Sequence, residues 1–222
     1  LTQQGALPIT GRVVGLDAVV DGFVVAYGSG AYSDRYWSSF YPAGSDKATY
    51  ATRAEFTITA LAATNGHGAV YSTANSRVGR LDDAGNELWK VALTQPPTTL
   101  HYIAATDQVL VGDERGNLTL LDPNGTPRWA IHLSDYAMRS VTTFVGSSEG
   151  EAMRFFAADA HGDLYIVDSA TNVLFGGSAT TSDVAALVPL GDTLTLIPRN
   201  ANWQTINPSA TQSAGLAGTL RL

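Results

Sequence analysis

The sequence predicts an all-β protein, a β-propeller of about five four-stranded antiparallel blades, and three observations support this prediction. A unit of roughly 43 residues recurs along the chain. Each copy contains four short runs rich in β-branched and aromatic residues, and turn residues separate these runs. Because one such sheet would leave both of its faces in water, we expect the repeats to stack face to face around an axis.

The repeat is clearest in three segments that superimpose without gaps, residues 69–89, 109–129 and 155–175. In each segment an aspartate precedes an aromatic residue by seven positions. The pairs are Asp82 and Trp89, Asp122 and Trp129, and Asp168 and Phe175. We expect these aromatic side chains to lie on outer strands and to pack between neighbouring blades.

Two weaker copies complete the series at the two ends of the chain. Taking Leu16, Leu61, Ile103, Phe144 and Leu187 as equivalent positions gives spacings of 45, 42, 41 and 43 residues. The predicted repeats are approximately 12–57, 58–99, 100–140, 141–182 and 183–222, within a single propeller domain over residues 1–222. The last outer strand is expected at 216–222, and residues 5–10 have no partner in this scheme.

Within each copy, the turns indicate how the strands are joined. Residues 115–117 and 161–163 are expected to join second to third strands, and residues 83–85 and 123–125 to join third to fourth strands. Glycine supplies the positive φ of tight turns, proline presets φ, and Asn or Asp binds its own backbone. Every copy is therefore predicted to be an antiparallel meander.

Composition excludes several classes of function. The 13 basic residues are scattered among 20 acidic ones and the net charge is −7, which argues against a nucleic-acid partner. The apolar runs are far shorter than the roughly 20 residues of a membrane-spanning helix, so no transmembrane segment is predicted. The chain has no cysteine, which excludes disulfides and thiolate metal sites.

The repeat motif runs from an apolar strand through Asp-x-x-Gly-Asn/Asp to a second apolar strand, an aspartate and a tryptophan. It resembles the PQQ-like propeller repeat of the quinoprotein dehydrogenases and the BamB-type assembly lipoproteins, and the best match is residues 109–129. A WD repeat is the alternative repeat type. Its Asp and Trp are adjacent, whereas seven positions separate them here. Since the resemblance implies about eight blades, this chain is either a small closed ring or a piece of a larger propeller.

The sequence predicts no catalytic residues, no cofactor and no metal site. The disulfide and calcium ligands that the quinoprotein resemblance implies have no counterpart here. The histidines fall at different phases of the repeats; they are His67, His101, His132 and His161. Asp113 and Asp159 recur at the same turn, which favours backbone capping over calcium binding. Neither a Gly-x-Ser-x-Gly elbow nor a phosphate loop is present.

One segment, residues 28–52, breaks the repeat and is the candidate binding region. Its candidate binding residues are Tyr32, Arg35, Tyr36, Trp37 and Tyr41, because aromatic and Arg side chains provide large contact areas at recognition surfaces. The alternative is that Trp37, Phe40 and Tyr41 form the third strand of the first blade and pack inward.

Three functions stay open from the sequence. The leading hypothesis is a non-catalytic scaffold that binds a protein partner in the bacterial cell envelope, in a periplasmic, outer-membrane-associated or extracellular location. The second is a propeller that binds or converts a sugar or quinone over its central channel. The third is a structural domain of a larger surface assembly or filament, as a homo-oligomer or with a sheet completed by a partner, since exposed sheet edges invite pairing.

Overall fold

The computed structural model describes residues 9, 11–28, 36–144, 153–180, 182–190 and 193–206. These residues form nineteen β-strands in five antiparallel sheets and contain no helix. The predicted all-β class and the blade-like sheets are therefore confirmed.

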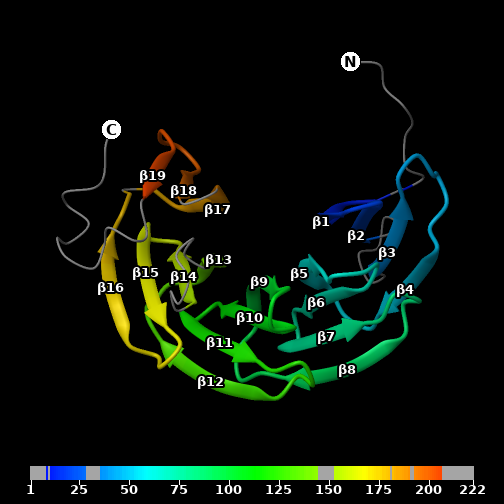
Figure 1. Cartoon of the computed structure of the whole chain (residues 1–222), viewed down its shortest axis with the longest axis horizontal. Coiled ribbons are helices and arrows are strands. Elements are labelled where there is room, and N and C mark those ends of the chain that lie inside the picture. Colours follow the sequence, from blue (N-terminus) through cyan, green and yellow to red (C-terminus); the bar gives the residue numbers. More distant parts are fainter. Residues whose placement is uncertain are drawn as a thin grey trace. The chain divides into compact units, whose positions relative to one another are not determined.

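The sheets follow one another along the chain, and the strands of each sheet are consecutive in the sequence (Figure 1). The first sheet contains β1 (Val13–Val19), β2 (Gly22–Gly28), β3 (Tyr36–Pro42) and β4 (Tyr50–Ala54), and the second β5 (Ile58–Ala63), β6 (Ala69–Thr73), β7 (Arg77–Leu81) and β8 (Glu87–Ala92). The third contains β9 (Pro97–Ile103), β10 (Gln108–Asp113), β11 (Asn117–Leu121) and β12 (Pro127–His132). The fourth contains β13 (Met138–Phe144), β14 (Arg154–Asp159), β15 (Asp163–Asp168) and β16 (Val173–Ser178).

The fifth sheet has three strands within the part of the chain that is described: β17 (Val184–Leu190), β18 (Thr193–Pro198) and β19 (Gln204–Ile206). The outer strand expected at 216–222 and the early residues 5–8 and 10 lie outside the described residues.

The chain divides into two compact units. One consists of residues 1–109 and 121–127, and the other of residues 110–120 and 128–222. In the first unit β5 contacts both β1 and β9, and in the second unit β13 contacts β17. Within each unit, therefore, the first strands of successive sheets pack together, as the inner strands of propeller blades do.

The core of the first unit lies between the first two sheets. Alternation along the strands places Val24 and Phe40 of the first sheet on the face that meets Ile58 and Leu81 of the second sheet. All four side chains are almost completely buried. At this joint the Tyr50 hydroxyl also donates a hydrogen bond to the His67 carbonyl oxygen, at 2.8 Å.

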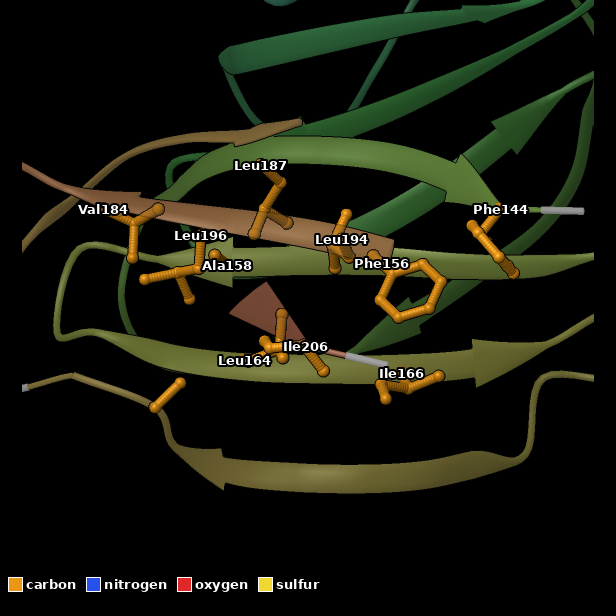
Figure 2. Close-up of a cluster of buried hydrophobic side chains, with 11 residues drawn as sticks. Phe144, Phe156, Ala158, Leu164, Ile166, Val184, Leu187, Leu194, Leu196 and Ile206 are labelled. Carbon is orange, nitrogen blue, oxygen red and sulfur yellow. The ribbon is translucent and has the colours of Figure 1, made fainter. Parts of the chain in front are cut away.

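The core of the second unit lies between the fourth and fifth sheets. Figure 2 shows leucines of β17 and β18 beside apolar side chains of β14 and β15. The buried members of this cluster are Phe144, Phe156, Ala158, Leu164, Ile166, Ala179, Val184, Leu187, Leu194, Leu196 and Ile206. Their burial ties the last sheet to the sheet before it.

The first strands of four sheets share a register shift near their beginning. The shifts fall after Val13, Ile58, Met138 and Val184, and they provide a structural alignment of the repeats.

Counting from these shifts, the equivalents of Leu16 and Leu61 are Val141 and Leu187. The expectation that Phe144 is the fourth equivalent was therefore wrong. Phe144 ends β13 on the opposite face, where it packs in the core of the second unit.

Candidate binding surfaces

The repeated aspartates bind their own turns. Asp82 Oδ1 accepts hydrogen bonds from the backbone N–H groups of Ala84 and Asn86, at 2.9 and 2.8 Å, and Oδ2 accepts one from the Asn86 side chain. The Asn86 side-chain amide is the main reason that the pKa of Asp82 lies below its usual value. Asp168 and Asn172 repeat this pattern, with the same effect on the pKa of Asp168. These carboxylates hold turns together.

Asp122 and Asp113 have equivalent roles. Asp122 Oδ1 accepts from the backbone N–H groups of Asn124 and Thr126. Asp113 accepts from the backbone of Arg115 and from both the backbone and the side chain of Asn117. The contacts of Asp113 are therefore those of the backbone cap that its position in the repeat indicates.

Asp159 lies at a buried joint of the second unit. It is fully buried, and its Oδ2 accepts the Ser134 hydroxyl at 2.6 Å and the Tyr165 hydroxyl at 3.3 Å. Its Oδ1 accepts three backbone N–H groups, from residues 161, 162 and 163. This carboxylate connects the segment after β12 to the turn between β14 and β15.

The repeated aromatic residues are Trp89, Trp129 and Phe175. They lie on β8, β12 and β16, the fourth strands of the second, third and fourth sheets. Trp89 Nε1 donates a hydrogen bond to the Pro123 carbonyl oxygen at 2.8 Å. A methyl group added at Gly125, which has a φ of 81°, would lie 2.7 Å from the Trp89 ring. Trp129 meets Phe155 edge to face, with ring centroids 5.1 Å apart, and Phe175 packs against the core of the second unit.

Arg80 lies in a polar cluster of the first unit together with Asp107 and Tyr102. Its guanidinium makes a two-point contact with the Asp107 carboxylate, at 2.7 and 3.0 Å. It also lies 5.8 Å from the centre of the Tyr102 ring, and the Tyr102 hydroxyl donates to Asp107 at 2.6 Å. A planar guanidinium suits such two-point recognition of a carboxylate. The cluster ties β7 to the turn after β9.

The ionisation of this cluster follows from its contacts. Burial, together with the hydrogen bond to Asp107 and its charge, raises the pKa of Tyr102 to about 12. For Asp107, burial would raise the pKa, but the hydrogen bonds from Arg80 and Tyr102 outweigh it and lower the pKa. The cluster was not predicted from the sequence, although a signal existed. Arg80 stands where the other clear repeats have the buried Leu120 and Ile166.

Beside Arg80 the surface has an open depression of about 390 Å³, which we name the Leu88 depression. Its lining includes Thr64, Arg80, Asp82, Asp83, Ala84 and Leu88. Its charged groups already have partners in the protein: Asp83 accepts the backbone N–H groups of His67 and Gly68. Leu88, by contrast, is 56% exposed. The depression therefore offers apolar contact area and acceptor lone pairs.

The predicted binding segment divides between two faces of the first sheet. Tyr32 and Arg35 lie outside the described residues. Tyr36 begins β3 and packs against the core of the first unit. Trp37 and Tyr41 lie on the opposite face, and Tyr41 is buried with its ring stacked on Phe23 at 6.0 Å. Burial raises the pKa of Tyr41.

That opposite face carries a row of aromatic side chains, and we name it the first-sheet face. Strand pairing sets Tyr27 opposite Trp37, Phe23 opposite Tyr41, and Leu16 opposite Val25. Residues paired directly across antiparallel strands share a face, so these side chains lie together. Leu16 is 63% exposed at the edge of this face.

The histidines belong to separate local contacts. His67 Nε2 lies 3.0 Å from Asp21, His132 lies near Asn117 and Asp135, and His161 stacks on the Tyr136 ring. His101 is partly buried, and this burial lowers its pKa. Within the described ranges, no three His, Asp or Glu side chains gather in a way that could hold a metal ion.

The comparisons with known proteins identify the fold. No protein-family model matches the chain, and no curated protein does. Among the solved structures it resembles the β-propeller domain of Cps50 (Swd1) from Myceliophteria thermophila, with a TM-score of 0.71 and 12% identity over 90% of this chain and 66% of that one. It also resembles BBS1N in complex with ARL6DN, with a TM-score of 0.71 and 16% identity over 96% of this chain and 70% of that one.

A third similar structure is BamB from Moraxella catarrhalis, with a TM-score of 0.63 and 17% identity over 88% of this chain and 61% of that one. The chain thus spans between 61% and 70% of the length of these three solved chains. In the part of the chain that is described, no helix has the length and apolar character needed to cross a membrane. The five antiparallel sheets and the solved structures that resemble them show that the chain has a β-propeller fold.

Proposed function

We propose that the chain is a non-catalytic scaffold that binds a protein partner at the Leu88 depression. The observation that carries this proposal is the contrast within the depression. Its charged groups are engaged by neighbouring groups of the protein, whereas Leu88 is 56% exposed. An acid or base for catalysis needs a group that is available to substrate. An exposed apolar side chain beside acceptor oxygens instead suits a peptide surface.

The partner chemistry follows from the lining. Asp82 and Asp83 lie beside Leu88 and retain acceptor capacity. We therefore expect a partner segment that places an apolar side chain on Leu88 and N–H donors, from its backbone or from Lys or Arg, beside the aspartates. Of the similar structures, BBS1N was solved in complex with ARL6DN, which illustrates that a chain of similar fold holds a partner.

A photo-reactive amino acid in place of Leu88 tests this function. We expect it to form one saturable covalent adduct with a protein of the source organism, and an excess of unlabelled chain should suppress that adduct. The control places the same group at Val173, which is 48% exposed on β16, the fourth strand of the fourth sheet. Equal capture at both positions, or capture that does not saturate, would contradict the proposal.

We further propose that the repeats are of the PQQ-like type and that the protein acts in the bacterial cell envelope. The seven-residue spacing from Asp122 to Trp129 supports the repeat type, and the fold similarity to BamB is compatible with it. From the same resemblance we propose that the protein is periplasmic, outer-membrane-associated or extracellular. Fractionation of the source bacterium tests it, and recovery in the cytosolic fraction alone would exclude it.

A second candidate function, a structural part of a larger assembly, is favoured by one observation. Leu16 on the first-sheet face is 63% exposed, although its equivalent Leu187 is 6% exposed.

A further inference from the structure

In the second unit, two arginines from neighbouring sheets meet at one aspartate. Arg139 lies on β13 of the fourth sheet, and Arg199 directly follows β18 of the fifth sheet. Arg139 Nε donates a hydrogen bond to Asp183 Oδ1 at 3.1 Å, and Arg199 Nε donates one to Asp183 Oδ2 at 2.8 Å. We name these three residues the Asp183 cluster. Two guanidinium groups against one carboxylate give it a net positive charge, on a chain whose net charge is −7.

The Asp183 cluster lies at the surface of the joint between the fourth and fifth sheets. At this joint β13 contacts β17, and the Ser140 hydroxyl oxygen accepts a hydrogen bond from the backbone N–H of Leu187 at 2.9 Å. The side chains of Arg139 and Arg199 are 39% and 57% exposed, whereas that of Asp183 is 28% exposed. The joint therefore positions both arginines, and solvent reaches both of their side chains.

The repeat does not require an ion pair at these positions. One backbone hydrogen bond recurs in four sheets, from the end of the second strand to the residue before the first strand, and it aligns Arg199 and Asp183 with the other sheets. The equivalents of Asp183 are Arg12, Thr57 and Ala137, and those of Arg199 are Gly28, Ala74 and Ala160. Because the first, second and fourth sheets form without an acid paired to a base there, the fold does not explain the Asp183 cluster.

The way in which the two arginines contact Asp183 leaves donors for a second acceptor. A guanidinium group carries N–H donors on Nε and on both Nη atoms. Arg80 contacts Asp107 through both of its Nη atoms, whereas Arg139 and Arg199 each contact Asp183 through Nε. Both oxygens of Asp183 are thus engaged, and the Nη groups of the two arginines remain for an anion from solution.

We propose that Arg139 and Arg199 bind a phosphoryl group, carried by free phosphate or by a phosphate monoester, and that Asp183 positions the two guanidinium groups. Guanidinium groups bind carboxylate and phosphate oxygens through two-point contacts. Two of them need several acceptor oxygens. A phosphoryl group offers three, with a charge of about −2 near neutral pH, whereas a carboxylate offers two and a single charge. This site belongs to the second unit and is independent of the Leu88 depression in the first.

Titrations of the full chain at constant ionic strength test the site, with the arginine Nε–H signals followed by nuclear magnetic resonance. Sodium phosphate should shift the signals of Arg139 and Arg199 until they saturate, and sodium acetate should give no saturable shift. Phosphoserine distinguishes the two sources of the phosphoryl group. A shift like that of phosphate shows that the site accepts monoesters, and no shift restricts it to the free anion; either result supports a phosphoryl site.

Three variants assign the binding to the two arginines. Arg139→Gln and Arg199→Gln, each followed at the remaining arginine, should weaken phosphate binding about tenfold, the effect of losing one hydrogen bond to a charged group. The matched control Arg128→Gln removes the same charge from an exposed position on β12 and should leave the affinity unchanged. Surface ion pairs add little stability, so all three variants should fold, and circular dichroism checks this.

Three results would overturn the proposal. The first is a wild-type chain whose arginine signals show no saturable shift with phosphate. The second is acetate binding as tight as phosphate binding, because a phosphoryl site needs the additional oxygen and charge. The third is a loss of affinity in Arg128→Gln equal to that in Arg139→Gln and Arg199→Gln, which would show that general charge, and not the Asp183 cluster, attracts the anion.

Discussion

Replacing Arg80 tests the interpretation of the joint between β7 and the turn after β9. Arg80→Ala removes the two-point contact with Asp107 and the buried aliphatic part of a side chain that is 14% exposed. Loss of two buried methylene groups costs about 1.6 kcal/mol. The ion pair adds about 1–2 kcal/mol, a value reduced from that of a buried pair because the Asp107 side chain is 43% exposed. We expect a total loss of about 3 kcal/mol.

A second substitution separates the two contributions. Arg80→Leu introduces the side chain that the third repeat has at Leu120, so it keeps the apolar contact and loses only the ion pair. We expect it to cost about 1–2 kcal/mol. Arg77→Ala, an exposed position on the same strand, should stay within about 0.5 kcal/mol of wild type.

Urea unfolding followed by tryptophan fluorescence measures these differences. A double-mutant cycle with Asp107→Asn should give a coupling energy of about 1–2 kcal/mol with Arg80→Ala. Asparagine is suitable at this position because residue 107 has a positive φ of 56°. The reasoning fails if Arg80→Ala costs less than about 1 kcal/mol, or if Arg80→Leu is as costly as Arg80→Ala.

Three further predictions concern the turns. Gly125→Ala should destabilise the protein by about 1 kcal/mol more than Gly44→Ala in thermal unfolding, because both glycines have positive φ but only the added methyl at Gly125 meets Trp89; equal losses would contradict the contact. Asp159→Ala should cost about 3–5 kcal/mol and Ser134→Ala about 1 kcal/mol, since the first leaves several buried donors unpaired; urea unfolding that ranks them in the opposite order would refute this. The pKa of Asp82 is lower in the folded chain, so its contribution to stability is present above the unfolded pKa of about 4 and is lost as the pH falls through the folded value; the stability difference between wild type and Asp82→Ala should therefore shrink on acidification, and a constant difference would count against the capping role.

The strand and turn pattern could be predicted from the sequence because it depends on local chemistry. The apolar runs around residues 109–111 and 118–121 became β10 and β11, and Gly116 between them adopts a positive φ of 74°. Each of these features follows from neighbouring residues alone. The single domain over residues 1–222 remains a prediction.

Register was harder to predict, because it depends on irregularities that have no strong sequence signal. A register shift after Met138 made Val141, and not Phe144, the equivalent of Leu16. Hydrophobicity alone does not distinguish these positions, since both carry buried apolar side chains.

The candidate site was predicted only in part. The alternation of side chains along β3 separates Tyr36 from Trp37 and Tyr41, so residues that are adjacent in the sequence face opposite sides of the sheet. The ion pair between Arg80 and Asp107 joins positions 27 residues apart, and it depends on how the second and third sheets pack. A charged residue at a repeat position that is otherwise buried was the available signal.

The central claim is that, within each unit, successive sheets pack through their first strands, and a designed disulfide tests it directly in the first unit. A Cβ atom built at Gly15 lies 2.8 Å from the Cβ atom of Leu61, so a separation of about 1 Å between the two strands brings the pair to disulfide geometry, and the natural chain contains no cysteine. Gly15→Cys combined with Leu61→Cys should therefore form an intramolecular disulfide after mild oxidation, which a non-reducing gel detects as a faster monomer band. Free thiols after oxidation, or disulfides between chains only, would contradict the packing of β1 against β5 and with it the blade joint.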